Sequence, residues 1–531
     1  MENINFFDRK SYLDTLEKHI KDLKDGYRRN IALLGDNAVG KTSIIFKFLS
    51  NFSDNHIIVA YLEIRPEPFE SFARRFIGVL LYNFMLNSGR RLEERLDFLI
   101  AESEKYIPKT ADKIRTLLGS LDKKKSHIFS DLLLLCDTIK QETGKSCVLI
   151  FDEFHNFESI AGAKKLFTEW AKALTTQKSA LYIIISSKRS RAKAILSKSL
   201  ALLFGNFQII EVEPFDTKVS EEYLTQRLTG SNINTGIKNF IVNFTGGFPY
   251  YLDAIASSLS KTDSADLTDM LENLLFVPSG ILNQRFLTNI NHLLEYFKGD
   301  SEYASILHTL ACGHNKIREL AHILRMPKKN LEIKISRLIE LDAVSRSADY
   351  LKINDRVFGF WLRFVYQEKL NSLTFNAEKQ RILFRDNIRG MIQDFTNHAR
   401  RPAIERISEL LHLFENDTIQ IERKKIRLNH FREIKPLEFK RPGMKNGLIG
   451  RSDESLWIMA LKSDSLNEDD IAEFARECKK YRHKAPRKII VTLQDIDANA
   501  RLKAMTEKIW TWDIDNINYI CDLFFKPRLI T

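Results

Sequence analysis

The sequence is poor in the residues that mark secreted, membrane-spanning or disordered chains. It has five cysteines in 531 residues, and no two of them form a C-x-x-C pair. This spacing argues against a zinc site or a disulfide framework and predicts a cytoplasmic location. The longest mostly apolar stretch, Phe76–Leu86, is far shorter than the ~20 residues that a membrane helix needs. The first ten residues lack the apolar core of a signal peptide, so neither a membrane nor secretion is expected.

An acidic excess is also lacking. The chain has 81 Lys and Arg against 69 Asp and Glu, a net charge of +12, which favours a polyanionic partner. Apolar residues make up 44% and charged residues 28%, which excludes a disordered or low-complexity chain. At ~150 residues per domain, the length predicts three to four domains.

The first 215 residues alternate apolar β-branched runs with helical patterns. The predicted strands are 30–35, 56–63, 146–152, 181–187 and 207–212. Continuous apolar strands separated by helices indicate a parallel sheet that is covered on both faces, so the predicted fold class is α/β.

After residue 215 the pattern becomes mainly helical. Short helical patterns over 291–342 are followed by two predicted strands, 343–347 and 350–354, and this order is typical of a winged helix. Residues 371–414 again have helical periodicity. The segments 455–461, 470–481 and 488–493 then predict a strand, a helix and a strand.

A glycine-rich loop follows the first predicted strand and matches G-x-x-x-x-G-K-[ST]. In such a loop the backbone N–H groups point at phosphate oxygens, the lysine neutralises the phosphates, and the Thr hydroxyl binds magnesium. We therefore predict ATP and Mg²⁺ as cofactors, with Lys41 as a catalytic residue as well. The predicted nucleotide-binding residues in the loop are Gly35, Asp36, Asn37, Ala38, Val39, Gly40, Lys41, Thr42 and Ser43.

Two adjacent carboxylates follow the third predicted strand. Asp152 is positioned to hold Mg²⁺ together with Thr42, as the Walker-B aspartate does in P-loop enzymes. Glu153 is positioned to orient and polarise the attacking water. The alternative is a strand that ends in solvated acidic residues.

Several motifs resemble those of archaeal-type P-loop ATPases, which are related to AAA+ and STAND ATPases and to origin-recognition initiators. The first is F-D-R-K, which begins at Phe7. The second is G-G-F-P-Y-Y-L, which begins at Gly246, and the third is Y-L-K-I-N-D, which begins at Tyr350. The resemblance implies that Arg9 lies near the base and that Pro249 covers the nucleotide from a helical lid.

The same resemblance has consequences for catalysis. It implies that Ser186 or Ser187, at the end of the fourth strand, senses the γ-phosphate, and we assign Ser187. Relatives often have a Gly-Arg pair after that strand, but this chain has Gly205-Asn206. An absent arginine finger predicts slow hydrolysis. Arg189 and Arg191 lie nearby as substitutes.

The resemblance also implies a domain order, because this family often continues into a restriction-endonuclease-like PD-(D/E)XK fold. The expected domains are a P-loop core (1–215), a helical lid (216–290), a winged helix (291–370), a helical linker (371–400) and a nuclease-like domain (401–531). We expect the last domain to be inactive. Lys462 matches the family's lysine, but Ala460 stands at the acidic position two residues earlier.

The predicted recognition helix of the winged helix runs from residue 328 to 341 and carries basic residues. A helix of this kind contacts phosphates from the major groove; the alternative is a solvated face of a packing module. A second basic run, 423–445, either follows a nucleic-acid backbone or is an exposed loop, and the loop interpretation is favoured. The predicted nucleic-acid contacts are Lys328, Lys329, Asn330, Lys334 and Arg337.

Together these patterns predict a slow ATPase that couples its nucleotide state to binding of duplex DNA or to assembly. The alternatives are a STAND-like signalling switch that acts through protein contacts, and an ATP-controlled nuclease. A homo-oligomer or a separate protein partner is compatible with all three functions.

Overall fold

The computed structural model contains two compact units. The first comprises residues 1–213 with 340–342, and the second comprises 214–339 with 343–531. The structure describes residues 6–90, 93–121, 128–160, 163–200, 207–230, 233–260, 266–368, 376–421, 424–440, 443–484, 486–494 and 496–530. The Gly205-Asn206 pair, which stands where relatives often have Gly-Arg, lies outside these ranges.

The first unit is built on a five-stranded parallel sheet with the order β2-β3-β4-β1-β5. Its strands are β1 (Asn30–Leu34), β2 (Ile57–Glu63), β3 (Ser146–Asp152), β4 (Ala180–Ser186) and β5 (Phe207–Glu211). All five predicted strands are therefore confirmed to within one residue at each end. Every residue of β1, β3 and β4 is buried, as continuous apolar runs require.

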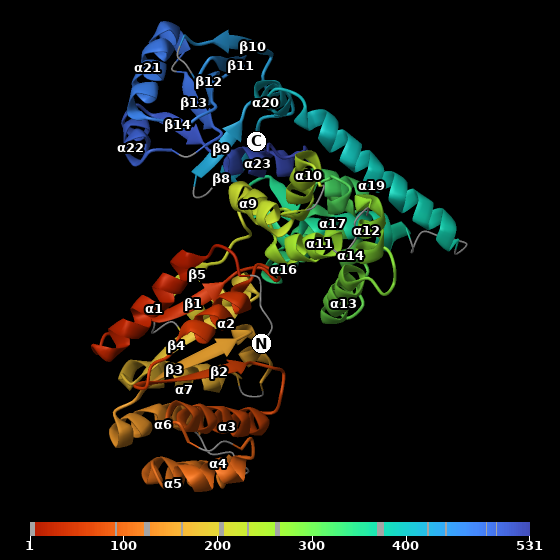
Figure 1. The fold of residues 1–531 in the computed structure, drawn as a ribbon. Coiled ribbons are helices and arrows are strands. Elements are labelled where there is room, and N and C mark those ends of the chain that lie inside the picture. Colours follow the sequence, from red (N-terminus) through yellow and green to blue (C-terminus); the bar gives the residue numbers. More distant parts are fainter. Residues whose placement is uncertain are drawn as a thin grey trace. The chain divides into compact units, whose positions relative to one another are not determined.

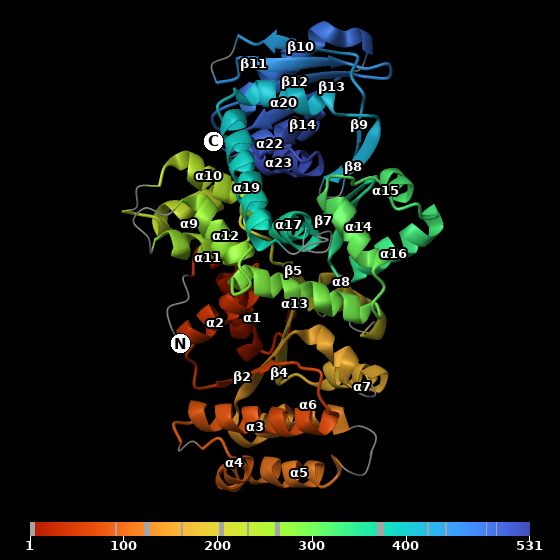
Figure 2. The same cartoon turned by 90° about the vertical axis from the view of Figure 1, so that its right-hand side faces the viewer.

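Helices cover both faces of this sheet, as Figure 1 shows. On one face lie α1 (Lys10–Lys24) and α2 (Lys41–Asn51); on the other lie α3 (Phe69–Asn87), α6 (Ile128–Thr143) and α7 (Ala163–Thr176). Two more helices, α4 (Leu96–Ser103) and α5 (Pro108–Leu118), form a layer outside α3 and α6 (Figures 1 and 2). The remaining elements are η2 (Phe154–Ser159), α8 (Arg189–Ala194) and η3 (Ile195–Ser199).

The second unit begins with a helical region. Its helices are α9 (Thr217–Arg227), α10 (Thr235–Thr245), α11 (Pro249–Leu259), α12 (Leu267–Leu275) and α13 (Ile281–Tyr296). They are followed by α14 (Glu302–Ala311), α15 (Ile317–Ile323) and α16 (Lys328–Glu340), and then by the antiparallel strands β6 (Val344–Ser347) and β7 (Tyr350–Ile353). The predicted hairpin is confirmed. Next come α17 (Arg356–Trp361), η5 (Leu362–Tyr366), α19 (Ala377–Ala399) and α20 (Ala403–His412).

The chain ends in a mixed sheet with the order β10-β11-β12-β13-β14. Its strands are β10 (Glu433–Glu438), β11 (Asn446–Arg451), β12 (Leu456–Lys462), β13 (Arg487–Thr492) and β14 (Ile509–Trp512). One face packs on α20 and α23 (Ile514–Leu523), and the other packs on α21 (Glu468–Cys478) and α22 (Ala498–Thr506). A short turn, η6 (Lys479–Lys484), follows α21. The predicted strand–helix–strand order is confirmed.

The basic run 423–445 is not simply a loop, and the favoured interpretation of it was wrong. Lys424–Leu428 forms β9, which pairs with β8 (Asp417–Ile421), and β10 also falls within the run. In β9 the basic side chains are exposed while Ile426 and Leu428 are buried. A period of two thus lets a strongly charged segment form a strand with one apolar face. Residues 422–423 and 441–442 lie outside the described ranges.

Candidate nucleotide site

The loop between β1 and α2 has the backbone that its glycines predict. A Cβ added to Gly35 would lie 2.3 Å from the carbonyl oxygen of Val212, so only glycine fits beside that strand end. Gly40 caps α2 with φ at 89°, and Ala38 also takes a left-handed conformation. These positive φ values curl the loop so that its N–H groups gather at the N-terminus of α2, which favours anions.

Lys41 begins α2 and is only 6% exposed. Its Nζ donates to the carbonyl oxygens of Gly35 at 3.0 Å and of Asp36 at 2.7 Å. Burial lowers the pKa of Lys41, and the carboxylates of Glu153, Asp152 and Asp36 partly oppose this. The loop thus holds a poorly solvated cation that a phosphate group can bind in place of the carbonyls.

Two side chains from different elements, α2 and β2, meet at Asp152, the last residue of β3. Its Oδ2 accepts hydrogen bonds from Thr42 Oγ1 at 3.0 Å and from the hydroxyl of Tyr61 at 2.7 Å. Burial raises the pKa of Asp152, so the carboxylate favours a nearby cation. Buried oxygen donors of this type fit Mg²⁺.

Tyr61 was missed in the sequence. It lies in β2, which is the neighbour of β3 in the sheet, two residues before the position that pairs with Asp152. A polar aromatic residue near the carboxyl end of an otherwise apolar strand was the only available signal. The relevance of that signal depended on β2 lying beside β3.

Glu153 follows in a left-handed conformation, with φ at 50°. Its Oε2 accepts hydrogen bonds from Ser187 Oγ at 2.7 Å and from Ser187 N at 3.3 Å. His155 Nδ1 lies 3.3 Å from the same oxygen and 3.0 Å from Ser186 Oγ. Burial, followed by the charges of Arg191 and Lys188, lowers the pKa of His155 to about 3, so its ring is neutral near pH 7.

The two serines at the end of β4 therefore differ. Ser186 is fully buried and bonds His155 and the backbone of Lys188. Ser187 contacts Glu153 directly through both its hydroxyl and its backbone N–H. Of the two serines, Ser187 is therefore the one that touches the carboxylate to which the sequence assigned the water-activating role.

The two nearby arginines also differ. Arg189 donates to Asp36 Oδ2 and to Glu213 Oε1, each at 2.8 Å. Arg191 instead pairs with Glu158 at 2.6 Å. Arg189 thus binds the phosphate-binding loop of its own chain.

Asp36 is a buried carboxylate within that loop. Its Oδ1 is buried without a hydrogen-bond partner. Burial raises the pKa of Asp36 to about 6, although Arg189 lowers it. Arg9, predicted to lie near the base, donates to the carbonyl oxygen of Glu213 at 2.5 Å. It therefore contacts the same residue, Glu213, as Arg189 does.

Part of the chain matches a known family. Residues 6–255 match the family described as an ATPase domain predominantly from Archaea. Residues 6–255 form an ATPase domain. No curated protein matches the chain at a significant level.

Solved structures also resemble the chain. A Walker-type ATPase of Pyrococcus abyssi is similar with a TM-score of 0.52 and 18% identity, over 67% of this chain and 96% of that one. The ORC2 protein of Aeropyrum pernix has a TM-score of 0.42 and 11% identity, over 74% of this chain and 96% of that one. The ORC1 protein of the same organism, solved in complex with DNA, has a TM-score of 0.34 and 11% identity, over 67% and 92%.

The Gly246-Gly247-Phe248-Pro249 segment lies within the matched residues 6–255 and belongs to the second unit. Gly247 has φ at 84°, and a Cβ there would lie 2.1 Å from the carbonyl oxygen of Phe215. The backbone N–H of Phe215 in turn donates to the carbonyl of Gly247 at 2.9 Å. Pro249 is the first residue of α11 and belongs to the second unit, so its place over the nucleotide stays a prediction.

The predicted nucleic-acid residues on α16 fall into two groups. Lys328, Lys329 and Asn330 are exposed in the first turn. Lys334 bonds Asp300 and, at 2.9 Å, Glu302, and its Nζ lies 4.5 Å from the ring centre of Tyr303. Arg337 Nη1 donates to the hydroxyl of Tyr303 at 3.3 Å, so the second group interacts with α14 and the residues before it.

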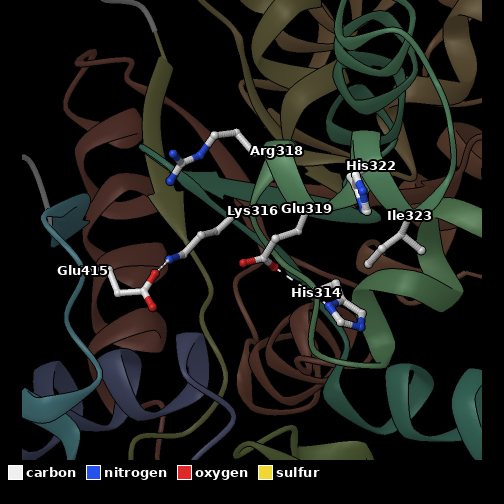
Figure 3. Close-up of a pocket in the computed structure, with 7 residues that line it drawn as sticks. All are labelled: His314, Lys316, Arg318, Glu319, His322, Ile323 and Glu415. Carbon is white, nitrogen blue, oxygen red and sulfur yellow. Dashed lines mark hydrogen bonds and ion pairs between the residues drawn. The ribbon is translucent and has the colours of Figure 1, made fainter.

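The β6–β7 hairpin packs against the C-terminal part of the second unit. The backbone N–H of Asp349 donates to the carbonyl of Thr418 at 3.2 Å, and the N–H of Thr418 donates to Asp349 Oδ2 at 2.7 Å. Figure 3 shows Lys316 paired with Glu415, which lies two residues before the start of β8. The distance from Lys316 Nζ to Glu415 Oε2 is 2.8 Å. Lys316 also pairs with Asp417 at 2.6 Å. The hairpin tip is therefore bonded to β8.

In the C-terminal sheet, the ion pairs that Lys462 forms with described residues are to two aspartates that follow it in the chain. Its Nζ lies 2.8 Å from Asp464 Oδ1 and 3.1 Å from Asp470 Oδ2. Ala460, at the predicted acidic position, pairs with Gly447 of β11. Across the described ranges, no group of three or more His, Cys, Asp or Glu side chains is arranged to hold a metal ion. Likewise, no helix among those described is long and apolar enough to cross a membrane.

Proposed function

We propose that this chain is a nucleotide-dependent switch that binds ATP with Mg²⁺, hydrolyses it slowly and changes the interactions of its second unit. The observation that carries this proposal is the 2.7 Å bond between Ser187 Oγ and Glu153 Oε2. A γ-phosphate competes with Glu153 for the Ser187 hydroxyl, because both are anionic acceptors. ATP binding therefore frees Glu153, and product release restores the bond.

Each residue of the site has a defined task in this proposal. The loop N–H groups from Asp36 to Gly40 bind the phosphates, and Lys41 exchanges its carbonyl partners for phosphate oxygens. Thr42 and Asp152 hold Mg²⁺, which when bound neutralises charge on the phosphates. Glu153 accepts the proton of the attacking water, while Ser187 donates to the γ-phosphate. Ser43, which follows Thr42 on α2, completes the proposed set of nucleotide-binding residues.

Substitutions at Glu153 test this assignment. We expect Glu153→Gln to bind ATP as tightly as the wild type and to hydrolyse it ~10²–10⁴-fold more slowly, because an amide cannot accept the proton. We expect Lys41→Ala to lose tight binding. The matched control is Glu158→Gln, since Glu158 lies in η2, the short helix that follows Glu153, and pairs with Arg191. Unchanged turnover in Glu153→Gln contradicts the proposal.

We further propose that the helical lid spans 216–290, the winged helix 291–370, the linker 371–400 and an inactive nuclease-like domain 401–531. The pairing of Lys462 with Asp464 and Asp470 supports inactivity, because it gives the lysine a structural partner. We expect no cleavage of linear, circular or single-stranded DNA with Mg²⁺ or Mn²⁺, with or without ATP. Cleavage that Lys462→Ala abolishes contradicts inactivity and favours the ATP-controlled nuclease.

The exposed first turn of α16 favours a second candidate function, binding of duplex DNA. Among the residues that the structure describes, Lys328 and Lys329 form no ion pair, whereas Lys334 pairs with Asp300 and Glu302. We expect the double variant Lys328→Ala/Lys329→Ala to reduce the salt dependence of DNA binding by about two phosphate contacts. The control is Lys379→Ala, an exposed lysine on α19. Absence of DNA binding by the wild type favours the signalling switch, acting through a protein partner or a homo-oligomer.

A further inference from the structure

The second unit contains a cavity of about 530 Å³. It lies among α14, β7, α17, α19 and the end of α23; Figure 2 shows α19 running past α17. Its wall includes apolar side chains and three basic ones. The apolar members are Leu310, Leu351, Ile353, Phe360, Phe364, Met391 and Phe525.

The inner part of this cavity carries more positive charge than its buried carboxylate requires. Asp522 Oδ2 accepts from Lys352 Nζ and from Arg528 Nη2, each at 2.8 Å, and Arg356 donates to Oδ1. Three cations therefore surround one carboxylate whose side chain is 3% exposed. Lys352 and Arg356 also line the cavity, where 26% and 28% of their side chains are exposed.

Such clustering of cations is unfavourable in the absence of a further anion, because like charges repel strongly where water is scarce. The attraction of Lys352, Arg356 and Arg528 holds the pKa of Asp522 well below its usual range, even though burial would raise it. Asp522 is thus ionised near pH 7, and Lys352 and Arg356, which line the cavity, share this one carboxylate with Arg528.

The outer part of the cavity has the opposite character. Asp386 and Asp394 lie two helical turns apart on α19, and both are exposed. Carboxylates in this position repel a polyanion such as a nucleic-acid backbone, whereas a ligand with one negative charge is tolerated if that charge lies against the basic residues.

We propose that this cavity binds a small organic monoanion with an apolar body, whose negative group contacts Lys352 and Arg356. Its apolar part lies against the leucines and phenylalanines of the wall. The site is separate from the nucleotide site and does not depend on ATP hydrolysis.

The test uses two probes that differ only in charge, 1-anilinonaphthalene-8-sulfonate and the uncharged N-phenyl-1-naphthylamine, with fluorescence titration of the full chain. In the wild type we expect saturable binding, at least tenfold tighter for the sulfonate. Lys352→Met removes the charge but leaves Asp522 its two arginines, and should weaken only the sulfonate, by about tenfold.

A second variant blocks the space without touching the charges. A Cβ added to Gly390, which lines the cavity from α19, meets no atom within 4 Å, so Gly390→Phe causes no clash at its Cβ. Its ring should fill part of the cavity and weaken both probes at least tenfold. Gln393→Phe is the matched control on the exposed face of the same helix and should leave both affinities unchanged. Equal binding of the two probes by the wild type, or unchanged sulfonate binding in Gly390→Phe, overturns the proposal.

Discussion

Replacing Asp36 by asparagine should stabilise the first unit at neutral pH. Burial raises the pKa of Asp36 from 3.8 to about 6, and Oδ1 lacks a hydrogen-bond partner. Between these two pH values the folded chain binds a proton that the unfolded chain has released. Stability therefore falls as the pH rises through this window, and the full cost remains above pH 6. At 1.36 kcal/mol per pKa unit, a shift of about two units costs about 3 kcal/mol.

Asp36→Asn should therefore raise the free energy of unfolding by less than about 1 kcal/mol near pH 4 and by about 3 kcal/mol near pH 7.5. Urea titrations followed by hydrogen exchange of the β1 and β3 amides report on this unit alone. Asp14→Asn, which removes an exposed carboxylate on α1, is the control. An advantage of the same size at both pH values would refute the argument that burial of the charge is the cause.

Three further predictions concern other contacts. Gly247→Ala should destabilise the second unit by more than about 1 kcal/mol in urea unfolding, because its φ is positive and a backbone carbonyl stands 2.1 Å from the added Cβ; Gly390→Ala, in open space, should not. Tyr61→Phe removes a hydrogen bond that lowers the pKa of the aspartate ending β3, so Mg²⁺-dependent ATP binding should weaken more at pH 6 than at pH 8 in calorimetric titrations. Lys462→Met leaves Asp470 buried without its cation and should lower the midpoint of thermal unfolding, while Lys480→Met, at an exposed pair, should not.

Local sequence determined the phosphate-binding loop and the strands of the first unit. Gly35, Gly40 and Lys41 lie within seven positions of one another, so the loop's own backbone preferences and the start of α2 specify their arrangement. The strands β1, β3 and β4 were equally readable, because each is a continuous, fully buried run made mostly of apolar residues. The β6–β7 hairpin was also predictable from short patterns.

Only the tertiary structure decided which distant side chains meet at the site. Strand order places β2 and β4 on either side of β3, and this brings Tyr61 to Asp152 and Ser187 to Glu153. Arg189 reaches Asp36 for the same reason, since β4 lies next to β1. No local pattern encodes the neighbour of a strand, because that choice depends on how all the strands and covering helices pack together.

The same limit explains the basic residues of the second unit. Helical spacing placed Lys334 on one face with other polar residues, but it could not show that Asp300 and Glu302 lie against that face. Likewise, Lys462 was visible in the sequence, whereas its burial against Asp470 depends on the packing of α21 beside β12. A charge can be read from one residue, but its electrostatic effect depends on the groups that folding places within a few ångströms of it.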